Sequence, residues 1–210
     1  MRSIKKGKEP NSLTEYKKHN NAYYDGCNKS DIRKALLKEQ GYLCAYCMKR
    51  ISENNMTIEH YSTQSNISEK EALDYNNMLG VCLGNRGAGK DNFTCDAHRG
   101  NDSLTVNPFL KSSIDLICYD DEGRIYSNDA KINKDLDKIL NLNCQQMLLV
   151  ANRRETLEAL KKYLSKLKSK GTWKKEFLEK IKRKYEYIDE DGNLKPYSGI
   201  ILYYLNKRIR

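Results

Sequence analysis

Four cysteines constrain this chain more than any other feature of its sequence. Cys44-Ala45-Tyr46-Cys47 has the spacing of a zinc knuckle, a tight turn whose backbone amides point at thiolate sulfurs. Cys82 and Cys95 follow it, separated from each other by 12 residues where a second knuckle would have two. The simpler alternative is that Cys82 is a buried core thiol. Because four thiolates satisfy Zn²⁺ tetrahedrally, we predict a structural zinc site made of all four.

The expected reducing compartment favours metal binding by these cysteines over disulfide formation. The chain has seven cysteines, and its basic N-terminus has no apolar segment behind it, so we expect no secretory signal. In a reducing compartment clustered thiols more often bind metal than pair. No apolar run reaches the 18 or so residues that a membrane span needs, so we expect a cytoplasmic protein without a membrane partner. Three remaining cysteines are predicted to be ordinary thiols: Cys27, Cys118 and Cys144.

An acidic residue and a histidine lie between the cysteine pairs. The apolar run Met56-Thr57-Ile58 predicts a short strand that delivers Glu59 and His60. A phosphodiester hydrolase needs a base to activate water and a divalent ion to stabilise the phosphate and the leaving oxygen. Glu59-His60 offers one group for each task. The alternative is that His60, one of three histidines, only supports the fold.

These residues resemble the HNH (ββα-metal) nucleases, in which an acidic-His pair, a central Asn and a later Asn, His or Asp share one hairpin and helix. In zinc-stapled members the central Asn lies five residues before a cysteine, as Asn77 does before Cys82. The later metal ligand follows the last cysteine directly, which is the position of Asp96. Thr63 departs from the pattern, since such nucleases often have Pro three residues after the His.

The resemblance implies a role for each matching residue. His60 would be the general base, and Asn77 would orient the His or its loop. Glu59 and Asp96 would bind Mg²⁺ or Mn²⁺, which prefer hard oxygen ligands. His98 is a rival for the last ligand, two residues beyond Asp96, and on a helix the two would point in different directions. Asp96 is favoured.

The likeness extends beyond this motif to the PtuB-like HNH subunits of Septu-type and retron-associated antiphage systems. It is carried by residues 1–7, 9–16, 39–47 and 74–77 and by Pro196-Tyr197-Ser198-Gly199. In that family the nuclease works with an ATPase subunit, PtuA. The resemblance therefore implies a PtuA-like ATPase partner and a role as effector of an antiphage complex.

The formal net charge of +10 is concentrated in one stretch, because residues 151–184 hold 13 Lys and Arg against 4 Glu. Such a surplus beside a candidate nuclease predicts contact with the phosphates of DNA or RNA. The alternatives are a solvated helix face and a docking surface for the partner. The candidate contacts are Arg99, Lys161, Lys162, Lys174 and Lys175.

The rest of the pattern predicts an α+β protein with a nuclease domain over residues 1–130 and a basic helical region over 131–210 packed on it. The first 28 residues are predicted to be mostly irregular, with a short helix that is capped by Ser12 or Thr14 and runs through Tyr16 to Lys18. An 11-residue helix from Ser30, one short helix within 68–76, and a hairpin over 115–126 follow. An apolar seam predicts a long helix, interrupted at Arg154: Met147, Val150, Leu157, Leu160, Leu164 and Leu167.

Two functions remain open at this point. The first is metal-dependent hydrolysis of phosphodiester bonds by an HNH endonuclease. The second is a zinc-held nucleic-acid-binding or assembly module without catalysis, in which Glu59 and His60 merely support the fold.

Overall fold

The computed structural model describes residues 1–63, 67–87, 89–167 and 173–209. Within these ranges helices surround two antiparallel sheets of two strands each, so the predicted α+β class is confirmed. The strands are β1 Met56–His60, β2 Met78–Cys82, β3 Ile117–Tyr119 and β4 Ile125–Ser127. The α-helices are α1 Asn11–Tyr16, α2 Lys29–Glu39, α3 Cys95–Arg99, α4 Lys111–Ile114, α5 Ala130–Lys134, α6 Leu149–Leu167, α7 Lys175–Glu186 and α8 Ser198–Ile209. Turns of 3₁₀ helix span Tyr24–Gly26, Glu53–Asn55, Glu71–Leu73, Tyr75–Asn77 and Lys90–Asn92, and a π-helical turn spans Asp135–Ile139.

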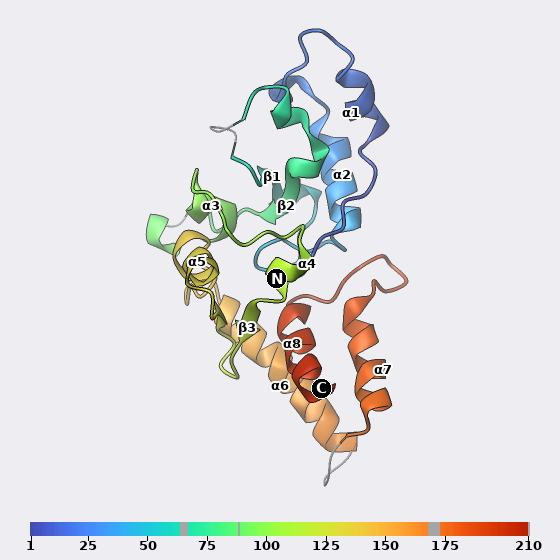
Figure 1. Ribbon diagram of the computed structural model, residues 1–210, viewed down its shortest axis with the longest axis vertical. Coiled ribbons are helices and arrows are strands. Elements are labelled where there is room, and N and C mark those ends of the chain that lie inside the picture. Colours follow the sequence, from blue (N-terminus) through green and yellow to red (C-terminus); the bar gives the residue numbers. More distant parts are fainter. Residues whose placement is uncertain (64–66, 88, 168–172, 210) are drawn as a thin grey trace.

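The molecule is elongated, and the small sheet of β1 and β2 lies at a different height from the basic helices (Figure 1). In this view α1, α2, β1, β2 and α3 form the upper part, while α6, α7 and α8 form the lower part. The strand β3 lies beside the upper end of α6 and α8. The candidate catalytic residues and the basic helices therefore belong to different ends of one body.

Strands β1 and β2 form the centre of the upper part. They are antiparallel, with Met56 opposite Cys82 and His60 opposite Met78. The buried Gln40 side chain joins α2 to β2, because its amide donates to the Gly80 carbonyl at 2.7 Å and accepts from the Gly80 N–H at 2.7 Å. A single side chain thus pairs both backbone groups of Gly80 that face α2.

Helix α2 follows the prediction closely and gains a cap that the sequence analysis did not identify. The Asn28 side chain accepts from the N–H groups of Ser30 and Asp31, which fixes the helix start at Lys29. After the helix, Gly41 has φ +56°, and a Cβ there would lie 2.4 Å from the Leu194 side chain. Glycine is required at this position by both conformation and space.

Three local predictions in the upper part were wrong or incomplete. The predicted N-terminal helix is present, but it covers Asn11–Tyr16, so it begins after Pro10 instead of at a Ser12 or Thr14 cap and ends before Lys18. The helix predicted within 68–76 is replaced by the two 3₁₀ turns Glu71–Leu73 and Tyr75–Asn77. Strand β2 is buried along its whole length, so it has no polar alternation by which residue pattern alone could mark it as a strand.

The apolar seam forms the buried face of α6 from Val150 onward, with three corrections. Met147 precedes the helix, which begins at Leu149. Arg153 is the buried arginine in this face, whereas Arg154 is exposed. Leu167 is 52% exposed, so the buried seam ends at Leu164. The Arg153 guanidinium donates to the carbonyls of Gly123 at 2.6 Å and Leu142 at 2.9 Å. It therefore supplies donors to loop carbonyls that have no strand partner at this depth.

The turn of the predicted hairpin packs directly on α6. Gly123 has φ +87°, and a Cβ there would lie 2.3 Å from the Val150 carbonyl oxygen. The absence of a side chain at Gly123 allows this approach, and Arg153 then binds the Gly123 carbonyl. The hairpin β3–β4 is thus fixed to the helical part at its turn.

The N-terminus also joins the two parts. The Met1 amine donates to the Tyr119 hydroxyl, and the Arg2 guanidinium donates to the carbonyls of Tyr185 and Glu186 beside the end of α7. These contacts agree with a helical region packed on the rest of the chain, while the boundary at residue 130 stays a prediction. Among the described residues, no helix has the length and apolar character needed to cross a bilayer.

We predict that Arg153→Met lowers the free energy of unfolding by about 2–4 kcal/mol, because it leaves buried carbonyls without donors. The neighbouring Arg154→Met is the matched control, since the Arg154 side chain is exposed and pairs with the exposed Glu122 at 3.5 Å, so its loss should change stability by less than about 1 kcal/mol. Urea denaturation of both variants measures the difference. Equal losses in the two variants would contradict the buried role of Arg153.

Candidate metal and carboxylate site

The four predicted cysteines meet in one buried cluster. Their sulfur atoms all lie within 4.8 Å of one another. Three sulfur–sulfur distances are 3.9 Å for Cys44–Cys95, 3.7 Å for Cys47–Cys82 and 3.8 Å for Cys82–Cys95. The edge of a ZnS₄ tetrahedron is about 3.8 Å when each Zn–S bond is about 2.3 Å. The spacing of the thiols therefore fits one tetrahedral zinc ion.

The pKa shifts of the clustered thiols also indicate that the site binds a cation. Hydrogen bonds from the Cys44 and other thiols raise the pKa of Cys47 and Cys95 well above the usual range. The same neighbours lower the pKa of Cys82. Without a cation these shifts favour a thiolate at Cys82 and protonated thiols at Cys47 and Cys95. All four can become thiolates only when a positive ion offsets their repulsion.

Three separate elements deliver the sulfurs. Cys44 and Cys47 lie in a tight turn in which Met48, with φ +63°, donates its N–H to the Cys44 carbonyl at 3.0 Å. Cys82 is the last residue of β2 and Cys95 the first of α3. The chain leaves the cluster at Cys82 and returns to it at Cys95, so this unusual spacing is compatible with a single site.

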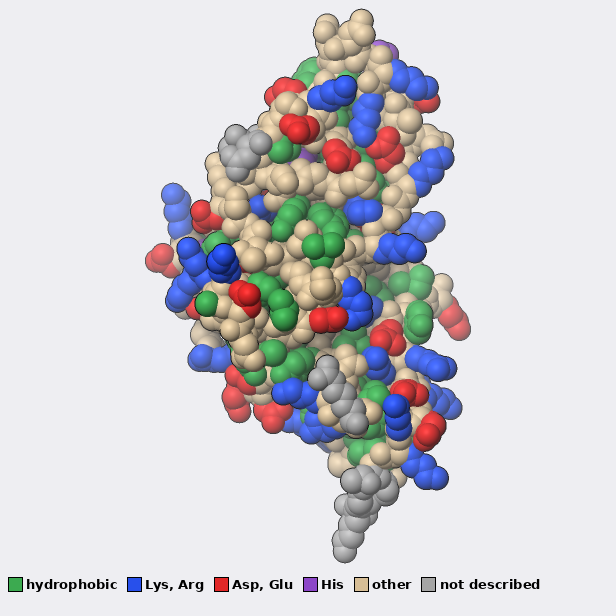
Figure 2. Space-filling view, viewed as in Figure 1, with side chains coloured by type: hydrophobic (Ala, Val, Ile, Leu, Met, Phe, Trp, Pro, Cys, Tyr) green, Lys and Arg blue, Asp and Glu red, His purple; other side chains and the backbone are tan. Residues whose placement is uncertain are grey.

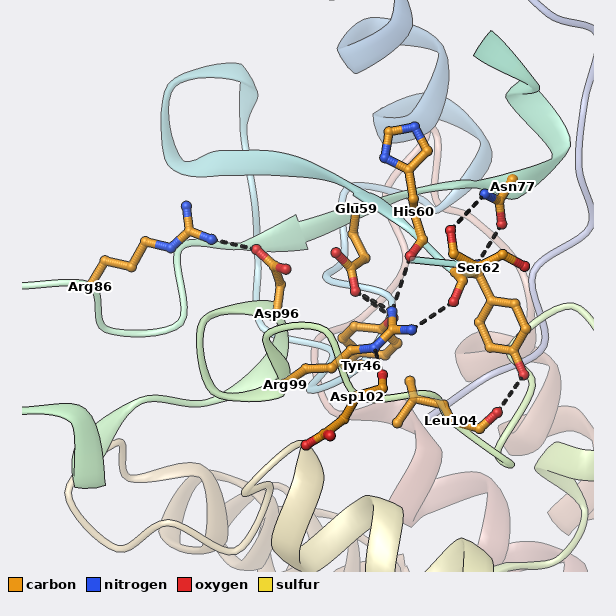
Figure 3. Close-up of polar contacts among 11 residues, drawn as sticks. Tyr46, Glu59, His60, Ser62, Asn77, Arg86, Asp96, Arg99, Asp102 and Leu104 are labelled. Carbon is orange, nitrogen blue, oxygen red and sulfur yellow. Dashed lines mark hydrogen bonds and ion pairs between the residues drawn. The ribbon is translucent and has the colours of Figure 1, made fainter. Parts of the chain in front are cut away.

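The candidate metal ligands Glu59 and Asp96 are brought together. Glu59 comes from β1 and Asp96 from the first turn of α3, and Figure 3 shows their carboxylates facing each other. Burial raises the pKa of Glu59 to about 8, with hydrogen bonding to Asp96 and its negative charge adding to the shift and Arg99 opposing it. Such a carboxylate pair suits a hard divalent cation, which would relieve their repulsion.

Arg99 was predicted to contact nucleic acid, and this prediction was wrong. Its side chain is 2% exposed and forms an ion pair with Glu59 in the interior. It also donates to the carbonyls of His60 at 3.1 Å, Tyr61 at 2.6 Å and Asp102 at 2.8 Å (Figure 3). The guanidinium therefore fixes the end of β1 and the position of Glu59, and it is not available to a phosphate.

The rival ligand His98 points elsewhere. Its Nδ1 lies 2.9 Å from the Ile139 carbonyl oxygen, at the end of the π-helical turn. Asp96 instead forms an ion pair of 2.6 Å with Arg86, whose side chain is 52% exposed. Of the two candidates, Asp96 is the one that shares a site with Glu59.

His60 is not brought to the carboxylate pair. Successive side chains of a strand point to opposite faces, and Figure 3 shows the His60 ring on the side of β1 away from the Glu59 carboxylate. The ring is 5% exposed, lies 4.6 Å from the Tyr24 ring and has Nε2 2.8 Å from the Ala72 carbonyl oxygen. A carbonyl only accepts, so Nε2 carries the proton and Nδ1 has a free lone pair. Burial lowers the pKa of His60, which favours this neutral form.

Asn77 lies where an orienting residue is expected. Its amide oxygen accepts from the Ser62 N–H at 2.7 Å, and its amide nitrogen donates to the Ser62 carbonyl at 3.0 Å. This two-point contact holds the backbone two residues after His60 (Figure 3). Asn77 therefore holds the loop that follows His60, while the His60 ring bonds to the Ala72 carbonyl.

The basic helices present charge at the surface. Lys161 is half-buried and pairs with Asp121 at 2.9 Å. Lys168 and Lys170, which belong to the basic stretch, fall outside the described residues. Figure 2 shows Lys and Arg over the lower part of one face, interleaved with carboxylates. Contact with nucleic acid stays a prediction for the three exposed candidates: Lys162, Lys174 and Lys175.

Comparison with known proteins supports the same class of site. No family model matches the chain. The chain is similar to the "Retron Ec83 putative HNH endonuclease" of Escherichia coli, with 28% identity over 120 residues. The similarity covers 48% of this chain and 46% of the relative, so it spans about half of each protein. It supports an HNH-type nuclease, and the narrower PtuB resemblance stays a prediction.

Sequence reasoning missed the two residues that support the carboxylates. Tyr46 lies inside the cysteine knuckle, is fully buried and donates its hydroxyl to Glu59 at 3.2 Å. Arg86 lies between Cys82 and Cys95 in sequence, where nothing in the pattern marked it. The knuckle position of Tyr46 was the available signal, because a residue between two metal ligands is held close to the site.

We predict one zinc ion per chain by elemental analysis, and Cys82→Ser should lose it together with cooperative unfolding, since zinc binding contributes about 10 kcal/mol or more in comparable sites. Cys118→Ser, outside the cluster and partly exposed, is the matched control and should keep both. A Cys82→Ser protein that retained full zinc would contradict the four-cysteine site.

Proposed function

We propose that this chain is a metal-dependent endonuclease of the HNH (ββα-metal) type that hydrolyses phosphodiester bonds. The observation that carries the proposal is the meeting of Glu59 and Asp96 beside a buried four-cysteine cluster. Strands β1 and β2 and helix α3 supply these groups in the strand–strand–helix order of that fold. The similarity to an HNH endonuclease gives independent support.

Each residue has a defined task in this proposal. Glu59 and Asp96 would hold Mg²⁺ or Mn²⁺, which stabilises negative charge on the phosphate and the leaving oxygen when bound. The Nδ1 atom of His60 would accept the proton of the attacking water. For His60 to act on a phosphate held by that ion, its ring has to leave the face of β1 on which it now lies against Tyr24 and Ala72.

The finer role belongs to the same proposal. We infer that the chain acts on DNA or RNA as the effector of an antiphage complex with a PtuA-like ATPase. The support is the resemblance along most of the chain, together with the word "retron" in the name of the similar protein. The exposed lysines of α7 and its preceding residue offer sequence-independent attraction for phosphates.

A zinc-held binding or assembly module is the second candidate function. The burial of His60 beneath Tyr24 favours it, because a base that water cannot reach does not catalyse hydrolysis. The two candidates differ in metal requirement. The module needs zinc alone, whereas the nuclease also needs a divalent ion at Glu59 and Asp96.

We predict that His60→Ala and Asp96→Ala each reduce Mg²⁺-dependent or Mn²⁺-dependent cleavage by about 10²–10⁴-fold while zinc content and folding remain. His19→Ala, at an exposed position, is the control and should cut at the parent rate. The assay uses protein purified from its host, so that any bound ATPase subunit is retained, with phage DNA and host tRNA as substrates. Cleavage at the parent rate by His60→Ala would refute the assigned base.

We also predict that Mn²⁺ binding depends on pH through Glu59. Because the pKa of Glu59 is raised to about 8, a proton has to leave when the ion binds below that pH. Affinity should therefore increase with pH, by up to about tenfold per unit below the pKa, and level off above it. Calorimetry in buffers of different ionisation enthalpy measures the released proton. Glu59→Gln should remove the pH dependence, and a pH-independent affinity in the parent chain would contradict the role of Glu59.

A further inference from the structure

A pocket lies between the β3–β4 hairpin and α8, far from the carboxylate pair along the chain. Its volume is about 310 Å³, which falls at the lower end of the range of small-molecule sites, about 300–1,000 Å³. Most of its lining is aromatic or cationic: Tyr119, Tyr126, Tyr203, Tyr204, Lys207 and Arg208. None of these residues has a part in the proposed nuclease site.

The tyrosines form a connected set at this pocket. The rings of Tyr119 and Tyr203 have centroids 5.9 Å apart at an angle of 60°. Tyr126 lines the same pocket. Tyr119 is buried, while Tyr126, Tyr203 and Tyr204 are partly exposed. The floor of the pocket is therefore held in place, and three rings keep part of their surface available to a ligand.

Cations lie over the exposed rings. The Arg208 guanidinium is 3.4 Å from the Tyr204 ring centroid, and the Lys207 ammonium is 4.6 Å from the Tyr203 centroid. Lys161 of α6 lies over Tyr204 at 5.6 Å and pairs with Asp121 at the rim. Partly exposed aromatic rings with cations beside them can bind a base and its phosphate together, because a base can take the place of a cation on a ring and leave that cation to pair with the phosphate.

Two acidic side chains add a polar rim. Asp120 and Asp121 both line the pocket, at the turn of the hairpin. Carboxylates repel phosphate, so a ligand that is only an anion would bind poorly beside them. They accept hydrogen bonds from sugar hydroxyls or the amino groups of a base. The mixed charge thus favours a ligand with hydroxyl or amino donors as well as a phosphate.

We propose that this pocket binds one nucleotide, with its base stacked on the exposed rings of Tyr203 and Tyr204 and its phosphate held by Lys207 and Arg208. The nucleotide is either a free mononucleotide or an unpaired nucleotide within a strand, since both present the same base and phosphate. In the second case the inference rests on the proposed nuclease function and adds that the nucleic-acid substrate contains an unpaired segment.

The binding of a fluorescein-labelled oligo-dT and oligo-rU, measured by anisotropy without added divalent ion, tests this site. Three competitors separate the possible ligands: free AMP and UMP, an abasic oligonucleotide with the same backbone, and a blunt duplex. We expect the single strands to bind and the abasic strand to bind at least about fivefold more weakly, because stacking contributes to each base held. Competition by AMP or UMP at the same pocket identifies a free mononucleotide as a ligand, whereas binding of strands alone assigns the pocket to an unpaired nucleotide within a chain.

Three variants and a control locate the binding. Tyr204→Leu should weaken binding by about 5- to 100-fold, and Tyr204→Phe, which keeps the ring, should bind as the parent does. Lys207→Gln, at an exposed position, should weaken binding and reduce its salt dependence. Tyr163→Leu is the matched control, because Tyr163 is 45% exposed on α6 but does not line the pocket.

Parent-like binding by Tyr204→Leu, equal binding of abasic and normal strands, or no binding of any nucleotide would each overturn the proposal. Lys207→Gln keeps the test valid if Tyr204→Leu fails to fold. Because no cleavage is measured, failure of this site leaves the proposed nuclease activity standing. Loss of cleavage in His60→Ala, conversely, leaves this pocket unaffected.

Discussion

The convergence of four thiols is the constraint on which the rest of the upper structure depends. The cluster joins the turn after α2, the end of β2 and the start of α3, which are separated by up to 51 residues in sequence. Short strands and a five-residue helix cannot hold such an arrangement by local propensity, since isolated two-stranded sheets and short helices are marginal in water. A bound ion would supply the missing stabilisation. Its removal is therefore expected to affect Glu59 and Asp96 as well as the cysteines.

A second constraint acts on the carboxylates. Arg99 pairs with Glu59 in the interior, and Arg86 pairs with Asp96 near the surface. The two ion pairs differ in the free energy that it costs to break them. Breaking the buried one would leave an uncompensated charge, whereas the exposed one can exchange with solvent or a ligand at little cost. Of the two carboxylates, Glu59 is therefore held in place, whereas Asp96 can change its partner.

The sequence predicted which side chains meet at the site better than how they are oriented. The cysteine spacing and the acidic-His pair follow from residue type, and α2 and the hairpin lie close to their predicted ranges. The burial of Arg99 could not be predicted, because an arginine beside a candidate site reads equally as a phosphate contact or as an interior ion pair. The side of β1 on which His60 lies also depends on tertiary packing, since it is the contacts with Tyr24 and Ala72 that hold the ring there.

The contact between Tyr24 and His60 has a kinetic consequence. Tyr24 belongs to a single 3₁₀ turn, Tyr24–Gly26, with no buried residue. A turn of this kind opens at a small fraction of the free energy needed to unfold the whole domain. Access to the imidazole would then follow the frequency with which this turn opens. A base covered in this way can remain inert for most of the time and still react whenever a partner or substrate holds the turn open.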